Sequence, residues 1–359
     1  MRKCYLAFVL LLISQFSFAS LPYFPLSFPR DEGAHYKNVP YAFNQLIEWW
    51  YLNGRLKTDE GRNLTYDIAL FNAAAMGGMI TQPMLHIQLA DLDRKQTYGV
   101  ANNYPYNTGK LATDKLDIVI EDDYSLKKTT INGREVYILK AQSQNENTFL
   151  KLDLTLEPVA RPFLINQNGL MPMPNDTNSY YYSIAHFNTT GTVTINNATY
   201  QIRMQKGDSW MDHQWGDFNV QKNGWEWFSI RLENGLVANV FLNIEYKNHM
   251  VVSGLANIIL PSGEMRFIPY KDFSVTRDDY WFDPKLSIAF PMTFTFDFPK
   301  LGLKIRNAAV FPEQELHGYW EGYCKVEAVY NKQDVSGFSY TELVYDNPSA
   351  NKPGRHLVG

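Results

Sequence analysis

The chain has 359 residues, enough for one large or two medium-sized domains with buried cores, and we expect two. It carries 33 Lys and Arg against 37 Asp and Glu, a formal net charge of −4. Because nucleic-acid-binding proteins need a basic stripe or patch, this charge argues against a nucleic-acid partner.

The first residues are typical of a secretory signal peptide. Two basic residues precede an apolar run, and a small-x-small cleavage site ends at Ala19. The run is too short to cross a bilayer as a helix, and no later segment reaches the roughly 20 apolar residues required. We therefore expect a signal peptide over 1–19, a secreted or periplasmic mature protein, and no transmembrane segment; contact with a membrane surface stays open.

Cysteine usage constrains the fold. Cys4 lies in the signal peptide, so only Cys324 remains after processing and no internal disulfide is expected. The fold must then depend on its hydrophobic core. We predict that Cys324, inside an aromatic strand-like run, is a buried small hydrophobe and not a nucleophile.

Beyond the signal peptide, the hydrophobic pattern has a period of two, which is typical of strands. The predicted strands are 64–71, 84–90, 116–120, 135–139, 150–156, 191–195, 199–204, 228–232, 236–244, 251–259, 292–298 and 303–310. Asn-Gly at 132–133 and 234–235 and Ser-Gly at 262–263 predict hairpin turns. Capped helical windows are nearly absent, so we predict an all-β protein built from barrels or sandwiches.

Residues 158–178 show no sustained strand pattern and are interrupted by Pro162, Gly169, Pro172, Pro174 and Asn175. We predict a long irregular loop there. Loops of this length in compact domains are often functional lids, and a plain connection between strands is the alternative.

An internal echo indicates two similar β-units. Trp49 is followed six residues later by Arg55 and a polar turn, and Trp225 is followed six residues later by Arg231 and a similar turn. We predict domains over 20–216 and 217–347, followed by a tail over 348–359.

Four of the eight tryptophans lie between residues 210 and 227, together with His213 and the carboxylates Asp212 and Glu226. Each buried indole N–H needs a hydrogen-bond partner, so this density favours a cavity wall over packing alone. We interpret the segment as two strands joined by a turn at 217–223, which brings rings and ionisable groups to one cavity. The alternative is a packed hairpin whose polar side chains bind the local backbone.

Several sequence blocks occur in order along the chain: FPRDEGAH at 28–35, EWWYLNG at 48–54, SYYYS at 179–183, GDSWMDHQWG at 207–216, GWEWF at 224–228, EQEL at 313–316, YWEG at 319–322 and YTEL at 340–343. Together they resemble the bipartite lipocalin family of AttH-like proteins and carotenoid 1,2-hydratases, some of which carry the label "predicted secreted hydrolase". The resemblance covers nearly the whole mature chain.

The resemblance implies two lipocalin-like antiparallel β-barrels packed together, with an apolar cavity in or between them. Relatives hydrate isoprenoid double bonds, hydrate a plant phenolic or direct cyclisations. The resemblance also implies a catalytic His-x-Trp pair, here His213 and Trp215, with an acid shortly afterwards. Glu226 is the nearest match for that acid, although relatives often have Asp at a different spacing.

These residue types suit protonation of a double bond. A carboxylic acid in apolar surroundings keeps its proton, and aromatic faces stabilise a cation. We predict a protein that binds a hydrophobic small molecule, of the isoprenoid, polyene or lipid type, and hydrates or isomerises it without a cofactor. The predicted catalytic residues are His213, Glu226 and Asp212. The predicted ligand-binding residues are Trp210, Trp215, Trp225, Trp227, Trp49, Trp50 and Tyr181.

Structural roles are the alternatives for the same residues. Trp215 and Trp227 could fill barrel ends, and Asp212 could cap its turn. We interpret Glu48 and Glu321 as members of internal ion pairs, with Arg55 or Arg231 as examples of possible partners.

Two other functions stay open: a carrier without catalysis, and the secreted hydrolase of the family label. Hydrolase chemistry has little support, because Gly-x-Ser-x-Gly and His-Glu-x-x-His motifs are absent from the sequence. The seven histidines show no close metal-ligand spacing, so no metal is expected. The oligomeric state and the identity of the ligand are not predictable from these patterns.

Overall fold

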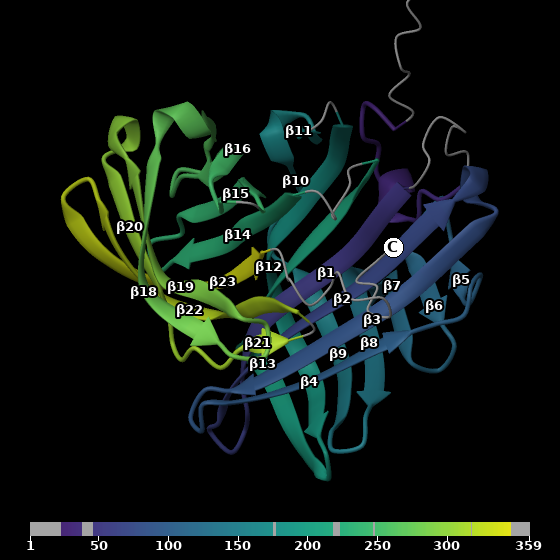
Figure 1. Cartoon of the computed structure of the whole chain (residues 1–359). Coiled ribbons are helices and arrows are strands. Elements are labelled where there is room, and N and C mark those ends of the chain that lie inside the picture. Colours follow the sequence, from purple (N-terminus) through teal and green to yellow (C-terminus); the bar gives the residue numbers. More distant parts are fainter. Residues whose placement is uncertain are drawn as a thin grey trace, which may run out of the picture.

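The computed structural model describes residues 23–37, 46–174, 177–217, 223–246, 248–316 and 318–345. These residues form two antiparallel sheets, each strongly curled into a half-barrel (Figure 1). The only helical elements among them are short 3-10 turns. The predicted all-β architecture with two packed antiparallel units is therefore confirmed, while the proposed signal peptide and the tail lie outside the described residues.

The first sheet has the strand order β4-β3-β2-β1-β13-β12-β9-β8-β7-β6-β5, with β10 and β11 added to β12. Its elements are η1 (Arg30–Glu32), β1 (Leu46–Lys57), β2 (Asn63–Ala75), η2 (Met76–Gly78), β3 (Ile80–Asp91), β4 (Gln96–Asn103), β5 (Lys110–Leu111), β6 (Asp117–Ile120), β7 (Tyr124–Ile131), β8 (Arg134–Gln144), β9 (Phe149–Pro158), β10 (Phe163–Leu164), η3 (Ile165–Gln167), β11 (Leu170–Met173), β12 (Thr177–Ile195) and β13 (Ala198–Gly216).

The second sheet has the order β17-β16-β15-β14-β23-β22-β20-β19-β18, with β21 added to β22. Its elements are β14 (Asn223–Leu232), β15 (Val237–Glu245), β16 (Val251–Ile259), β17 (Met265–Pro269), η4 (Tyr270–Asp272), β18 (Ser274–Asp283), β19 (Ile288–Phe298), η5 (Pro299–Leu301), β20 (Leu303–Ala309), β21 (Glu315–Leu316), β22 (Tyr319–Tyr330) and β23 (Gln333–Val344). In both sheets the first strand pairs with the second and with the last.

All twelve predicted strand segments overlap strands of the structure. Asn132 and Gly133 both have positive φ and join β7 to β8, as expected of a two-residue hairpin turn. The loop predicted over 158–178 is less irregular than expected, because β10 and β11 inside it pair with β12.

The two strands predicted on either side of the turn at 217–223 are present as β13 and β14, but they do not pair with each other, and residues 218–222 lie outside the described part of the chain. β13 pairs with β1 and β12, whereas β14 pairs with β15 and β23 of the other sheet. The tryptophan-rich segment therefore runs from one sheet into the other. The domain boundary near residue 216 stays a prediction.

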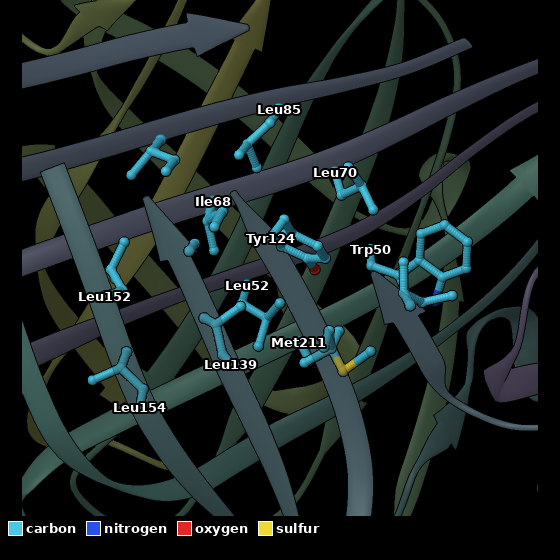
Figure 2. Packing of buried hydrophobic residues seen from close by; sticks show 14 of the residues in the cluster. Trp50, Leu52, Ile68, Leu70, Leu85, Tyr124, Leu139, Leu152, Leu154 and Met211 are labelled. Atoms are coloured by element: carbon cyan, nitrogen blue, oxygen red, sulfur yellow. The ribbon is translucent and has the colours of Figure 1, made fainter. Parts of the chain in front are cut away.

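Alternating side chains build three apolar layers. One face of the first sheet fills its half-barrel, where Leu52, Ile68 and Leu139 point toward one another beside Trp50 (Figure 2). The second half-barrel has an equivalent phenylalanine-rich core. The outer faces of the two sheets share a third cluster, so the half-barrels pack back to back.

The described residues contain no helix that is long and apolar enough to cross a membrane.

Candidate functional site

A narrow cleft, partly open to solvent, lies in the layer between the two half-barrels, and its cavity volume of about 20 Å³ is about that of one water molecule. Its walls are Trp49, Tyr51, Ala69, Phe71, Tyr181, Asp212, Gln214, Trp225, Trp227, Phe241, Tyr319, Glu321 and Glu342. Both sheets contribute, and the wall residues include three carboxylates but no Lys or Arg. The rings of Trp49 on β1 and Trp225 on β14 lie 6.1 Å apart and nearly parallel, at 16°.

Asp212 connects the two walls of the cleft. Its carboxylate accepts hydrogen bonds from the Tyr181 hydroxyl at 2.5 Å, from Trp210 Nε1 at 2.7 Å and from the Ser183 hydroxyl. The Tyr181 hydroxyl in turn accepts from Trp227 Nε1 of the second sheet at 2.9 Å. Burial raises the pKa of Asp212 to about 7, although the hydrogen bonds oppose that shift.

Three further carboxyl groups lie close together on the other side of the cleft. Glu321 on β22 and Glu342 on β23 are directly opposite cross-strand neighbours. Asp67 on β2 accepts a hydrogen bond from Gln88 Nε2 at 3.0 Å, and Glu342 accepts one from Trp225 Nε1 at 3.0 Å. The first sheet thus adds a carboxyl group to a pair supplied by the second.

Crowding and burial favour the protonated form of these groups. Burial, reinforced by the neighbouring carboxylates, raises the pKa values of Glu321 and Asp67 well above their usual range. Burial also raises the pKa of Glu342 to about 7, although its side chain is partly exposed. Glu321 Oε1 is buried and has no hydrogen-bond partner among the described residues. Its surroundings therefore favour the protonated form of Glu321, and one of its oxygens is still available.

The arginines expected to pair with Glu48 and Glu321 lie elsewhere. Arg231 and Arg55 both approach Asp208, at 2.6 and 3.7 Å. The ion-pair interpretation is therefore wrong for Glu321, which has carboxyl neighbours, whereas Glu48 does pair, with the histidines His35 and His213 in place of an arginine.

His213 lies on the opposite face of β13 from Asp212, inside the first half-barrel. Its Nε2 is 2.9 Å from Glu48 Oε1, and its Nδ1 is 3.3 Å from the Tyr182 hydroxyl. Trp50 stacks on the His213 ring at 4.7 Å, and Trp215 belongs to the same core. Burial lowers the pKa of His213. His213 and Trp215 are thus separated from the cleft by the strand that carries them.

Glu226 lies inside the second half-barrel. Arg277 Nε and Nη2 donate to its two carboxylate oxygens at 2.7 and 2.6 Å, and the Tyr345 hydroxyl donates a further hydrogen bond. The structure therefore does not bring His213, Glu226 and Asp212 to one cavity, and only Asp212 lines the cleft.

The predicted ligand-binding residues divide in the same way. Trp49, Trp225, Trp227 and Tyr181 line the cleft. Trp210 packs in the layer between the sheets, behind Asp212, whereas Trp50 and Trp215 belong to the core of the first half-barrel.

The sequence model of the AttH-like family matches residues 20–345. The chain belongs to the AttH-like family. No curated protein matches it.

Several solved structures share the fold of this AttH-like chain. An AttH protein from Nitrosomonas europaea is 23% identical, with a TM-score of 0.72 over 90% of this chain and 98% of that one. Kievitone hydratase from Nectria haematococca is 15% identical, with a TM-score of 0.67 over 83% of this chain and 89% of its own. CghA in complex with Sch210972 is 13% identical, with a TM-score of 0.53 over 90% and 97% of the two chains. At these identities the likeness concerns the fold alone.

Sequence reasoning missed the carboxyl cluster of this AttH-like protein. Asp67, Glu321 and Glu342 come from three strands, and no local motif connects them. The available signal was the alternation along the strands. Glu321 follows Trp320 and Glu342 precedes Leu343, each in a strand-like run. Such positions place a carboxyl group opposite a core-facing side chain, and here that outward face is covered by the other sheet.

Proposed function

We propose that this AttH-like protein binds a flat, uncharged hydrophobic molecule in the cleft and protonates a double bond of it, with Glu321 as the proton donor. The observation that carries the proposal is the buried Glu321 carboxyl, whose Oε1 has no partner among the described residues in an aromatic-walled cleft, and whose pKa is raised by burial and by its carboxyl neighbours. Water addition or migration of the double bond completes the reaction.

The chemistry follows from the wall residues. The Glu321 proton forms a C–H bond with one alkene carbon and leaves a cation on the other carbon, while Glu321 becomes a carboxylate. Faces of Trp49 and Trp225 stabilise that cation, a contact worth ~2 kcal/mol when desolvated. In hydration, water forms the C–O bond and its released proton returns to the carboxylate. In isomerisation, a neighbouring carbon returns the proton instead.

Gln214 is suited to position the water. It lines the cleft, and its Nε2 is buried without a hydrogen-bond partner among the described residues. An amide donor of this kind binds either a ligand oxygen or the oxygen of a water molecule. The amide N–H occupies one lone pair of the water oxygen, so the other lone pair is free to attack the cation.

The walls also support the ligand class. Nearly parallel rings on opposite walls suit a planar conjugated group, which enters between them when the two walls move apart, and the crowded carboxyl groups disfavour an anion. The fold shared with kievitone hydratase makes hydration the preferred reaction. Export of the mature protein, inferred from the signal-peptide pattern, is part of the proposal.

The test is turnover in isotopically labelled water. The purified protein is incubated with a panel of polyenes, isoprenoids and prenylated phenolics in D2O or H2(18)O, and products are identified by mass spectrometry. The expected product gains one water or carries deuterium at carbon. Glu321→Gln should reduce the rate by at least about 100-fold, the usual contribution of a general acid, while ligand binding persists.

Glu313→Gln is the matched control, because Glu313 is exposed on the segment just before β21. Unchanged turnover in Glu321→Gln would contradict the assigned proton donor. Binding that Trp225→Ala weakens, without turnover of any compound in the panel, would favour the carrier function. Cleaved products would favour the hydrolase function.

A further inference from the structure

A second polar cluster lies inside the first half-barrel. His35 follows η1, Glu48 lies in the inward-facing row of β1 between Leu46 and Trp50, and His213 is on β13. One nitrogen of each histidine and a carboxylate oxygen of Glu48 lie within 4.8 Å of one another. All three side chains are buried. Three residues that are distant in sequence thus present their ligand atoms to one point.

Both histidines direct a nitrogen to the same oxygen. His35 Nδ1 is 2.6 Å and His213 Nε2 is 2.9 Å from Glu48 Oε1. The opposite nitrogen of each ring also has a partner: Asp31 Oδ1 lies 3.3 Å from His35 Nε2, and the Tyr182 hydroxyl lies 3.3 Å from His213 Nδ1. Metal-binding histidines have this arrangement, in which a carboxylate or another oxygen fixes the tautomer and the ring orientation.

Neighbouring side chains fix the orientation of the rings, and some polar atoms beside them lack hydrogen-bond partners among the described residues. Trp215 stacks on His35 at 3.7 Å and 4°. Asn72 is the cross-strand neighbour of Glu48, and neither its Oδ1 nor its Nδ2 has a partner among the described residues. A buried amide without partners costs about 1–3 kcal/mol. Two nitrogen ligands and one carboxylate oxygen match a zinc site with three protein ligands, in which water takes the fourth position.

We propose that His35, Glu48 and His213 bind a Zn²⁺ ion inside the first half-barrel, at a site separate from the cleft. The ion joins the segment before β1 to the pairing of β1 with β13. Trp49 and Asp212, the next residues along these strands, line the cleft on the opposite face. The ion therefore positions one cleft wall and does not touch the ligand.

Metal content and a spectroscopic probe test the site. The purified protein, dialysed against zinc and then desalted, should contain one zinc per chain by elemental mass spectrometry. Co²⁺ added to the metal-free protein should give the visible absorption of a four-coordinate site. Chelation should lower the thermal midpoint, because a ligand that binds only the folded state stabilises it.

Variants localise the metal. His35→Ala and His213→Ala should abolish stoichiometric binding, and Tyr182→Phe should weaken it by roughly tenfold, as is usual when the partner of a ligand is removed. His186→Ala is the matched control, because this partly exposed histidine contacts Asp208 and lies outside the cluster. Circular dichroism of each variant establishes folding.

A wild-type protein that folds fully and binds neither zinc nor Co²⁺ would overturn the proposal, since hydrogen bonds alone would then hold the cluster together. Equal metal binding by His213→Ala and wild type would also overturn it. If the alanine variants fail to fold, the Co²⁺ spectrum of the wild type and the Tyr182→Phe affinity still decide the question.

Discussion

The buried glutamates differ in the partners that surround their carboxyl groups. Glu226 is bound by a guanidinium, Glu48 by two imidazoles, and Glu321 by other carboxyl groups. Only the last environment favours the neutral acid. The same residue type on three strands therefore supplies an internal ion pair, a candidate metal ligand and a candidate proton donor.

Stability should fall as the pH rises through the titration of Glu342. Its pKa is raised from 4.5 to about 7 by burial, so its favourable contribution is complete below pH 4.5 and is lost as the pH passes about 7. At about 1.4 kcal/mol per pH unit, the loss is at most about 3 kcal/mol, and less because the side chain is partly exposed. Thermal midpoints measured from pH 4.5 to 8.5 check this expectation.

The variant Glu342→Gln keeps an oxygen that can accept from Trp225 Nε1 but cannot ionise. It should be more stable than the wild type at pH 8 and show a flatter profile. Glu321 and Asp67 continue to titrate beside it, so some dependence should persist. An identical profile in wild type and variant would show that Glu342 keeps an ordinary pKa.

Removal of the Arg277 guanidinium should destabilise the second half-barrel. Arg277→Ala leaves the Glu226 carboxylate buried without its cation, which should lower the free energy of unfolding by about 3–5 kcal/mol. Chemical denaturation measures the change. The double variant Arg277→Met, Glu226→Leu should recover most of the loss, and a single-variant cost below about 1 kcal/mol would contradict the role of the pair.

The sequence identified the segment around Asp212 as important, but it did not show which of its side chains face the cleft and which face the half-barrel core. Trp210 and Asp212 face the other sheet, whereas Met211 and His213 face the half-barrel core. Alternation along a strand predicts this division. Which outward face would be covered could not be predicted, because it depends on the packing of a second sheet.

Strands β1 and β13 each separate two polar sites. One face of each strand contributes to the histidine cluster and the other to the cleft. Their pairing is close enough to exclude a side chain at Gly54, where an added Cβ would meet Asp208 O at 2.5 Å and Tyr66 Cε1 at 2.7 Å. The relative position of the two strands is therefore fixed by backbone contact.

Gly54→Ala should destabilise the protein by about 2–3 kcal/mol, the upper part of the range for overpacking, since backbone atoms cannot move aside. Gly133→Ala is the comparison: its Cβ would meet nothing within 4 Å, and the residue has a φ of 77°. The cost there should be only about 1 kcal/mol, from backbone strain. Equal costs in urea denaturation would argue against the close contact of β1 with β13.

The strands themselves were largely predictable because their alternation is local, whereas their partners were not. Trp225 follows Trp215 by ten residues, yet they belong to different sheets. β14 instead pairs with β23, whose residues lie more than one hundred positions later. Local patterns do not specify pairings of this kind, which depend on burial of whole faces.

The two half-barrels share the layer that contains Trp227, Phe241 and Leu255 from one sheet and Trp49 and Tyr51 from the other. Hydrogen bonds cross this layer, for example from Gln88 Nε2 to the Glu321 carbonyl at 2.7 Å. Each sheet therefore covers apolar surface of the other. The family resemblance predicted two packed units, and the structure adds that they meet through their outer faces.

We expect the two half-barrels to unfold as one cooperative unit. Circular dichroism and tryptophan fluorescence should give coincident transitions. Phe241→Ala, a truncation in the shared layer, should cost about 3–5 kcal/mol and lower the protection of both sheets in hydrogen exchange. Loss of protection confined to β14–β23 would show that the half-barrels are independent.

Because the half-barrels pack back to back, the two walls of the cleft should differ in how well they tolerate substitution. Trp49 and Asp212 lie on strands whose opposite faces carry the histidine cluster. Substitutions of these two residues to alter ligand preference should therefore also disturb that cluster. On the other wall, Phe241 lies between Val240 and Leu242 of the second apolar core, which tolerates replacement by residues of similar volume, whereas Trp225 precedes the Glu226–Arg277 ion pair. Attempts to redirect this protein to another small molecule should therefore begin with the second half-barrel.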